Sequence, residues 1–169
     1  MLYGAFIMGT YGRKIIKDLD IDELIKLLNK ALADEWLAYY QYWIGAQVIE
    51  GPMSSAVIVE LMEHAGDEFR HAGMLVDRIV KLGGTPLLKP EDWYKETNCG
   101  YEVPEDFFVK KILEQNIKGE QCAIATYQKL VDLTSGKDII TYNMILEILQ
   151  DEIEHEDDLE VLLENIKML

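Results

Sequence analysis

Apolar residues recur every three or four positions over four long stretches of this chain, which is the pattern of amphipathic helices. Helix-breaking pairs at Gly51-Pro52 and Ser135-Gly136 separate two pairs of stretches by short joints, whereas about twenty residues separate the second stretch from the third. The pattern predicts an N-terminal extension over residues 1–19, a crossover over residues 83–103, and helices over residues 20–50, 53–82, 104–134 and 137–168.

The lengths of these connections predict the topology. A short joint forces the two helices that it connects to lie antiparallel. The crossover, with one short helical turn expected at 91–95, is long enough to return along the bundle, so the second and third helices can run parallel. The expected fold is all-α, a single domain over residues 1–169 that forms an antiparallel four-helix bundle with one long crossover.

Four glutamates stand on apolar helix faces, each near the middle of its predicted helix. Glu35, for example, has Leu32, Ala31 and Leu28 at helical offsets of three, four and seven. A buried carboxylate without a partner costs several kcal/mol or more, and these faces carry no lysine or arginine. Because helix midpoints coincide in a bundle, a bound metal is the simplest partner for all four: Glu35, Glu68, Glu120 and Glu152.

Two of the three histidines repeat one spacing, in Glu68-x-x-His71 and Glu152-x-x-His155. This interval places both side chains of each pair on one helix face, where they can bind one ion. Four carboxylates balance the charge of two divalent ions, which would lie roughly 3.5–4 Å apart. Mixed carboxylate and imidazole ligands suit iron or manganese, whereas zinc more usually takes sulfur or histidine.

The net charge of the chain limits the kinds of partner that it can bind. The formal net charge is 16 − 31 = −15, which argues against nucleic acid and anionic membranes, and a small basic cluster at Arg13, Lys14 and Lys17 is interpreted as solvated. No apolar stretch reaches the ~18 residues that span a bilayer. The apolar segment Met1–Met8 lacks a basic leading region, so no signal peptide is expected and the predicted location is cytoplasmic.

The six ligand positions resemble those of the ferritin-like di-iron carboxylate proteins, over about residues 20–168, and within that group bacterioferritin most. The resemblance implies a di-iron site with bridging carboxylates from Glu68 and Glu152 and terminal ones from Glu35 and Glu120. It also implies one iron ligand from each histidine, so that the catalytic and metal-binding residues are Glu35, Glu68, His71, Glu120, Glu152 and His155.

Three further positions refine the comparison with bacterioferritin. Tyr42, seven residues after Glu35, matches a tyrosine near the bacterioferritin centre, which implies an electron donor, with a core aromatic as the alternative. Phe69 stands where bacterioferritin has its haem-ligating methionine, so no haem is expected. His64, one turn before Glu68, is not counted as a ligand; it either supports the ligands or lies partly exposed.

The two cysteines and the end of the chain resemble a narrower group. Cys99 in the crossover and Cys122, two residues after Glu120, resemble the cysteine pair of the Dps-like thioferritins, which form dodecamers. The resemblance implies a redox-active or structural disulfide between them, and two free thiols in a reducing cytoplasm remain the alternative. Little chain follows the fourth helix, which leaves no fifth helix of the 24-subunit ferritins and implies a smaller cage.

The function expected from this resemblance is that of a ferroxidase in a thioferritin-like homo-oligomeric cage. It would oxidise Fe²⁺ with hydrogen peroxide or oxygen, for iron storage and protection against oxidants. One alternative is a rubrerythrin-like or manganese-catalase-like peroxidase without storage, although the Cys-x-x-Cys pairs of rubrerythrin are absent. A Dps-style DNA-coating protein is the other, and this chain lacks the lysine-rich tail that it would need.

Overall fold

A computed structural model describes residues 10–168 of the chain, and the apolar segment Met1–Met8 lies outside these described residues. Within them the structure contains six helices and no strand. None of these helices has the length and apolar character needed to cross a membrane. The helices are α1 (Thr10–Lys14), α2 (Ile21–Val48), α3 (Ser54–Lys81), α4 (Pro90–Glu96), α5 (Val109–Thr134) and α6 (Ile139–Lys167).

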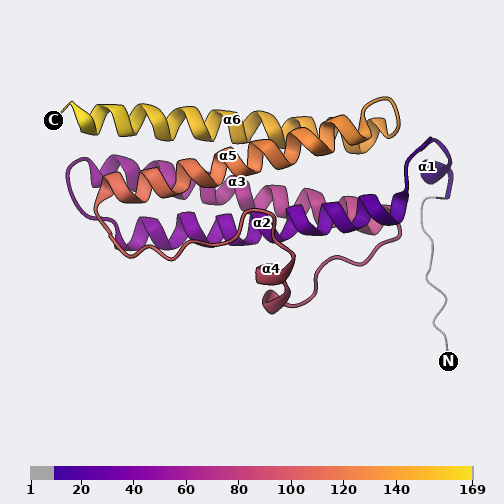
Figure 1. The fold of residues 1–169 in the computed structure, drawn as a ribbon, viewed down its shortest axis with the longest axis horizontal. Coiled ribbons are helices and arrows are strands. Elements are labelled where there is room, and N and C mark those ends of the chain that lie inside the picture. Colours follow the sequence, from indigo (N-terminus) through magenta and orange to yellow (C-terminus); the bar gives the residue numbers. More distant parts are fainter. Residues whose placement is uncertain (1–9, 169) are drawn as a thin grey trace.

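The four long helices form a bundle in which α2 packs against α3 and α5 packs against α6, each pair antiparallel (Figure 1). Between α3 and α5 the chain returns along the length of the bundle beside α2 and carries the short helix α4 (Figure 1). As a result α3 and α5 run parallel. The all-α bundle with one long crossover, expected from the connection lengths, is confirmed.

Aspartates cap the first and last helices of the bundle. Asp20 Oδ1 accepts hydrogen bonds from the backbone amides of Asp22 and Glu23, at 3.0 and 3.1 Å. Asp138 Oδ1 caps α6 in the same way, accepting from the amides of Ile140 and Thr141 at 3.2 Å. Both caps satisfy amides that have no partner inside the helix, which fixes where α2 and α6 begin.

The start of α5 differs from the sequence expectation. The helix begins at Val109, five residues after the start expected at Pro104. The backbone of Glu50 donates to Phe107 O at 2.9 Å and accepts from Val109 N at 2.8 Å, as a parallel bridge would. This pairing holds the residues before α5 extended against the α2–α3 turn, a long-range contact that local helix signals do not contain.

The core consists of two apolar clusters with a polar layer between them. On every long helix the special glutamate falls between a segment of the first cluster and a segment of the second: on α2, for example, Leu24–Leu32 precede Glu35 and Tyr42–Ala46 follow it. The order is the same around Glu152 on α6 and reversed around Glu68 and Glu120, because α3 and α5 run opposite to α2 and α6. Apolar packing on both sides therefore fixes the position of the four carboxylates along the bundle.

Candidate metal centre

Four glutamates and two histidines from the four long helices converge in the polar layer of the bundle. All six side chains are buried, with at most 4% of any of these residues exposed. They form two groups whose ligand atoms lie within 4.8 Å of one another, and the two groups share Glu68 and Glu152. The structure thus brings together all six residues selected from the sequence: Glu35, Glu68, His71, Glu120, Glu152 and His155.

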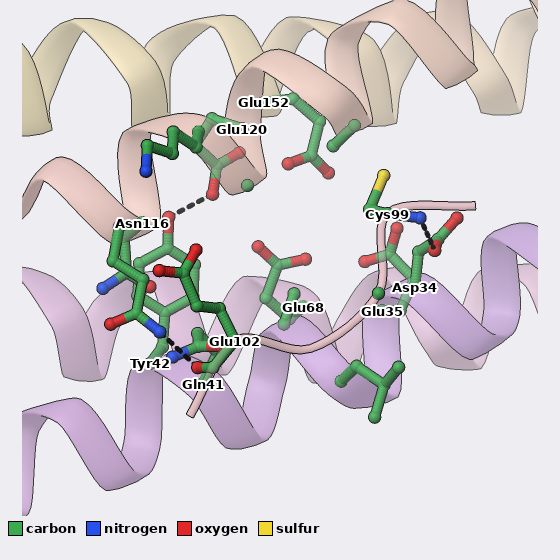
Figure 2. A pocket seen from close by; sticks show the side chains of 17 residues that line it. Asp34, Glu35, Gln41, Tyr42, Glu68, Cys99, Glu102, Asn116, Glu120 and Glu152 are labelled. Carbon is green, nitrogen blue, oxygen red and sulfur yellow. Dashed lines mark hydrogen bonds between the residues drawn. The ribbon is translucent and has the colours of Figure 1, made fainter. Parts of the chain in front are cut away.

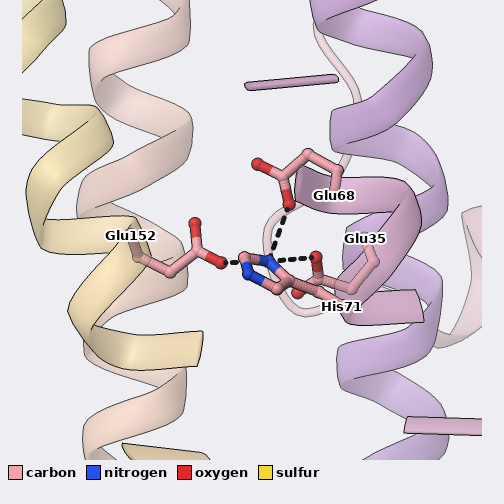
Figure 3. Close-up of side chains that lie close together, drawn as sticks. All are labelled: Glu35, Glu68, His71 and Glu152. Atoms are coloured by element: carbon pink, nitrogen blue, oxygen red, sulfur yellow. Dashed lines mark ion pairs between the residues drawn. The ribbon is translucent and has the colours of Figure 1, made fainter. Parts of the chain in front are cut away.

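His71 stands at the centre of the first group (Figure 3). Its Nδ1 lies 3.4 Å from Glu35 Oε2, 3.6 Å from Glu68 Oε2 and 3.1 Å from Glu152 Oε1. Three carboxylate oxygens from three different helices therefore face one imidazole nitrogen. One such cluster is a suitable ligand set for a single divalent ion.

The second group repeats this arrangement around His155. Its Nδ1 lies 3.7 Å from Glu68 Oε1, 4.0 Å from Glu120 Oε2 and 3.7 Å from Glu152 Oε2. Glu68 and Glu152 therefore present one oxygen to each group, whereas Glu120 reaches only the second and Glu35 only the first. This is the geometry that two bridging and two terminal carboxylates require.

Each of the six side chains has one buried polar atom without a hydrogen-bond partner. Buried polar atoms are almost always paired, so six unpaired ones that face each other need a common explanation. They comprise four carboxylate oxygens and two imidazole nitrogens, a donor set that suits iron or manganese. The atoms are Glu35 Oε2, Glu68 Oε1, His71 Nδ1, Glu120 Oε2, Glu152 Oε1 and His155 Nδ1.

Two buried tyrosines orient the carboxylates of Glu35 and Glu120. The Tyr42 hydroxyl on α2 donates to Glu120 Oε1 on α5 (Figure 2), and the Tyr127 hydroxyl on α5 donates to Glu35 Oε1 on α2. Burial and the neighbouring carboxylates raise the pKa of both phenols well above the usual value, so both keep the proton that they donate. Each carboxylate is thereby left with one oxygen free to bind a metal.

Tyr127 is a site residue that was not predicted from the sequence. It follows Glu120 by seven residues, the interval at which Tyr42 follows Glu35. An interval of seven places both side chains on one helix face. The repeated interval was therefore the available signal, although it does not reveal that each tyrosine bonds the glutamate of the other helix.

The outer nitrogens of the two histidines face a second layer of carboxylates. His71 Nε2 lies 3.0 Å from Asp151 Oδ2, and His155 Nε2 lies 3.6 Å from Asp67 Oδ2. Arg70 forms ion pairs with both aspartates. Carboxylates in this position orient an imidazole toward a metal and strengthen it as a ligand. No sequence pattern distinguishes these aspartates from ordinary surface acids, so they could not be predicted from the sequence.

Protons balance part of the negative charge of the buried carboxylates. Burial, together with the charges of Glu152 and Glu35, raises the pKa of Glu68 well above its usual value. Burial opposes a charge on His71, but the carboxylates of Glu152, Glu35 and Glu68 outweigh it and raise the pKa of His71. A proton on His71 therefore supplies part of the positive charge that the buried carboxylates need.

A cavity of about 120 Å³ leads to the cluster and is lined by carboxylates and by Cys99 of the crossover (Figure 2). Cys99 is joined to Cys122 on α5 by a disulfide, with the two Cα atoms 5.7 Å apart. Asp34, next to Glu35, holds the crossover on the other side, because it accepts hydrogen bonds from the backbone amides of Asn98 and Cys99 at 2.8 and 2.9 Å. The crossover is therefore tied to both α2 and α5 beside the cluster.

His64 lies beside the cluster but outside both ligand groups. It is 1% exposed, so the partly exposed position considered for it is wrong. Its ring stacks on that of His155, with centroids 4.0 Å apart, and contacts Tyr42 edge to face. Burial and the neighbouring His155 lower the pKa of His64 to about 3, so its imidazole is neutral.

Comparisons with known proteins agree with this geometry. A solved structure described as a dodecameric thioferritin, the bacterioferritin-related protein from Bacteroides fragilis, superposes with a TM-score of 0.93 at 43% identity, covering 95% of this chain and 96% of its own. The DNA protection during starvation protein of Pyrococcus furiosus is 34% identical over 92% of this chain and 86% of its own length. The Dps structure from Thermosynechococcus elongatus shares the fold, with a TM-score of 0.80 at 20% identity over 84% of this chain and 90% of its own.

A family model gives the same assignment over most of the chain. The model described as a ferritin-like domain matches residues 25–169, which include all six converging ligand residues and both cysteines. The resemblance inferred from the ligand spacing is confirmed by this match. The chain belongs to the ferritin-like family.

Proposed function

We propose that this protein is a di-iron ferroxidase that assembles into a ferritin-like cage for iron storage and protection against oxidants. Fe²⁺ is both the substrate and the ion that the six ligand residues hold, two per subunit, and hydrogen peroxide or oxygen is the oxidant. Manganese fits the same ligands, and zinc fits them less well. The single observation that carries the proposal is the set of six buried, mutually facing and unpaired ligand atoms.

The chain's own residues would perform three tasks in this reaction. Glu68 and Glu152 would hold both ions at once, since each faces both histidines. When bound, the metal pair supplies the electrons that reduce the oxidant. Nδ1 of His71 would give up its proton on loading, because a nitrogen that binds a metal must be unprotonated. The cavity beside Cys99 gives a small oxidant a path to the carboxylates.

Anaerobic addition of Fe²⁺, followed by peroxide or oxygen, tests the proposal directly. We expect rapid oxidation and retention of many more than two irons per subunit. Retention of only two irons per subunit would exclude iron storage and favour the rubrerythrin-like or manganese-catalase-like alternative. Replacement of one ligand by Glu120→Ala should abolish the rapid phase while the helices persist, whereas Glu114→Ala on the partly exposed side of α5 should oxidise iron normally. Unchanged kinetics in Glu120→Ala would contradict the assignment.

The assembly that we propose is a dodecamer without haem. The Bacteroides fragilis protein, at 43% identity, is described as dodecameric, which supports twelve subunits here. The expected mass is 12 × 19.4 kDa, or about 233 kDa, and light scattering would measure it. A dimer would instead favour a small oxidase.

Protection of DNA by this protein would not need contact with DNA. The Pyrococcus furiosus relative carries DNA protection in its name, but this chain has a formal net charge of −15, which repels phosphate. We propose that it acts by consuming ferrous iron and peroxide. A gel-shift assay at physiological salt should show no complex with duplex DNA.

The disulfide between Cys99 and Cys122 has a proposed role beside the oxidant path. Cys99 lines the cavity that reaches the carboxylates, so the bond borders the route that peroxide would take. We propose that it fixes the crossover there and is open to reduction by thiols. A thiol count on untreated and on reduced protein tests for the disulfide. Two free thiols in the untreated, air-exposed protein would show that the bond does not form.

A further inference from the structure

A third group of metal-ligating side chains lies outside the six ligand residues. Glu60 and His64 on α3 and Asp158 on α6 offer one ligand atom each, and these atoms lie within 4.8 Å of one another. His64 Nε2 is 3.3 Å from Glu60 Oε1 and 3.9 Å from Asp158 Oδ2. One imidazole nitrogen and two carboxylate oxygens from two helices therefore face a common point.

His64 is the group that needs an explanation. It is 1% exposed, and neither of its ring nitrogens has a hydrogen-bond partner. Buried polar atoms are rarely left unpaired, and a histidine that only filled space could be replaced by an apolar side chain at no such cost. The Nε2 atom points toward two carboxylates, which is the arrangement expected of a metal ligand.

The surroundings lack a positive charge that could balance these carboxylates. The group borders a hollow of about 140 Å³ lined by six carboxylates and two imidazoles. Arg70 pairs with two of the six, Asp67 and Asp151. In residues 10–168, no lysine or arginine comes within 4.0 Å of the carboxylates of Glu60 or Asp158. A cation from solvent would supply the missing charge.

We propose that Glu60, His64 and Asp158 form a separate site for a divalent transition-metal ion. Mixed oxygen and imidazole ligands suit Fe²⁺, Mn²⁺ or Co²⁺, with water completing the coordination shell. Glu60 and Asp158 are partly exposed, whereas His64 is buried against the ring of His155. The ion would therefore lie between solvent and the His155 half of the centre. This hollow shares no lining residue with the cavity beside Cys99, so it reaches the centre by a different route.

Anaerobic crystals soaked in CoCl₂ test the proposal by location, and equilibrium dialysis against Co²⁺ tests it by number. We expect an anomalous difference peak among the three side chains in the unchanged protein. His64→Leu and Asp158→Asn should each remove that peak and lower the bound Co²⁺ by one per chain. Asp158 is partly exposed, so its variant should fold even if a change at His64 disturbs packing.

Two further variants separate this site from its neighbours. Glu63→Gln changes the same charge in the same hollow but lies outside the three-residue group, so it should keep the peak and the full Co²⁺ count. Glu120→Ala should lose ions from the dinuclear centre and keep this one. If the dinuclear sites were occupied and no density appeared at His64, the inference would be overturned and the proposed function would stand. Empty dinuclear sites would overturn the proposed function. Retention of the peak in both His64→Leu and Asp158→Asn would also overturn the inference.

Discussion

Tyr42 and Tyr127 join the two helix pairs by an exchange of hydrogen bonds at the centre of the bundle. Tyr42 follows Glu35 by seven residues and donates to Glu120, whereas Tyr127 follows Glu120 by seven residues and donates to Glu35. One oxygen of Glu35 and one of Glu120 are thereby occupied, and the second oxygen of each is unpaired. The tyrosines therefore decide which oxygen faces the proposed metal site, as outer partners do in many metal centres.

Tyr127→Phe should weaken metal binding as much as Tyr42→Phe. Either change removes the hydroxyl that fixes a terminal carboxylate and leaves a buried oxygen without its donor. We expect affinity for Co²⁺ to fall by about 10-fold to 100-fold in each variant, the usual effect of losing an outer partner. Anaerobic titration followed by visible absorption would measure it.

Tyr94→Phe provides the matched control, because this tyrosine is exposed on α4 and has no contact with the cluster. It should bind Co²⁺ as the unchanged protein does. If Tyr42→Phe weakened binding and Tyr127→Phe did not, the equivalence of the two tyrosines would be disproved. A tyrosyl radical signal that disappears in Tyr42→Phe alone would instead support the electron-donor role suggested for that residue.

At the scale of helices, the periodic pattern of apolar residues predicted most of the fold. The four apolar faces predicted four long helices, and the unequal connections predicted their directions. The caps at Asp20 and Asp138 lie where the sequence expected α2 and α6 to begin. Each of the four glutamates interrupts an apolar face near the middle of its helix, and this position predicted that the glutamates meet at one level of the bundle.

Features that depend on contacts distant in sequence could not be predicted in this way. The late start of α5 follows from backbone pairing with Glu50, and the second layer of Asp67, Asp151 and Arg70 follows from the way α3 faces α6. Neither leaves a local pattern. The pairing of the cysteines was inferred only from the resemblance to thioferritins, since spacing alone does not determine connectivity.

Asp34 links α2 to the crossover, and its loss should loosen that segment. The carboxylate accepts hydrogen bonds from the backbone amides of Asn98 and Cys99. In Asp34→Ala the Asn98 amide would lose its acceptor, and the Cys99 amide would keep only Thr97 Oγ1. A lost acceptor of this kind costs about 1–3 kcal/mol, so amide exchange over residues 97–101 should become on the order of 10-fold faster. Hydrogen exchange followed by mass spectrometry would measure it.

Asp157→Ala, on the exposed face of α6, is the matched control and should leave exchange in the crossover unchanged. Faster exchange should also bring faster reduction of the disulfide, because Cys99 lies in the loosened segment. Equal exchange rates in Asp34→Ala and in the unchanged protein would show that the disulfide alone holds the crossover.

At the scale of the whole molecule, we expect the buried carboxylates to couple metal binding to the stability of the fold. Burial and the charge of neighbouring carboxylates raise the pKa values of Glu68 and Glu120 well above the usual 4.5, and nearby carboxylates raise that of His71. A raised folded-state pKa means that the folded protein binds more protons than the unfolded chain. The resulting stability is present below the unfolded pKa and is lost as pH rises through the folded one.

The metal-free protein should therefore lose stability as the pH rises above about 4.5, whereas the metal-loaded protein should not. Deprotonated ligands bind ions more tightly, so the stabilisation by metal should increase over the same range; an ion at 100 times its Kd adds about 2.7 kcal/mol. Thermal unfolding at a series of pH values, with and without Co²⁺, would measure both trends.

The variant Glu120→Gln tests whether the pH dependence of stability comes from the buried carboxylates or from the acidic surface. This change removes a buried carboxylate that must hold a proton or bind a metal, so it should flatten the pH dependence of the metal-free protein and reduce the stabilisation by Co²⁺. Glu160→Gln removes one exposed charge from α6 and should do neither. If both variants altered the pH dependence equally, surface repulsion would be its cause, and the buried carboxylates would contribute no measurable coupling between metal and fold.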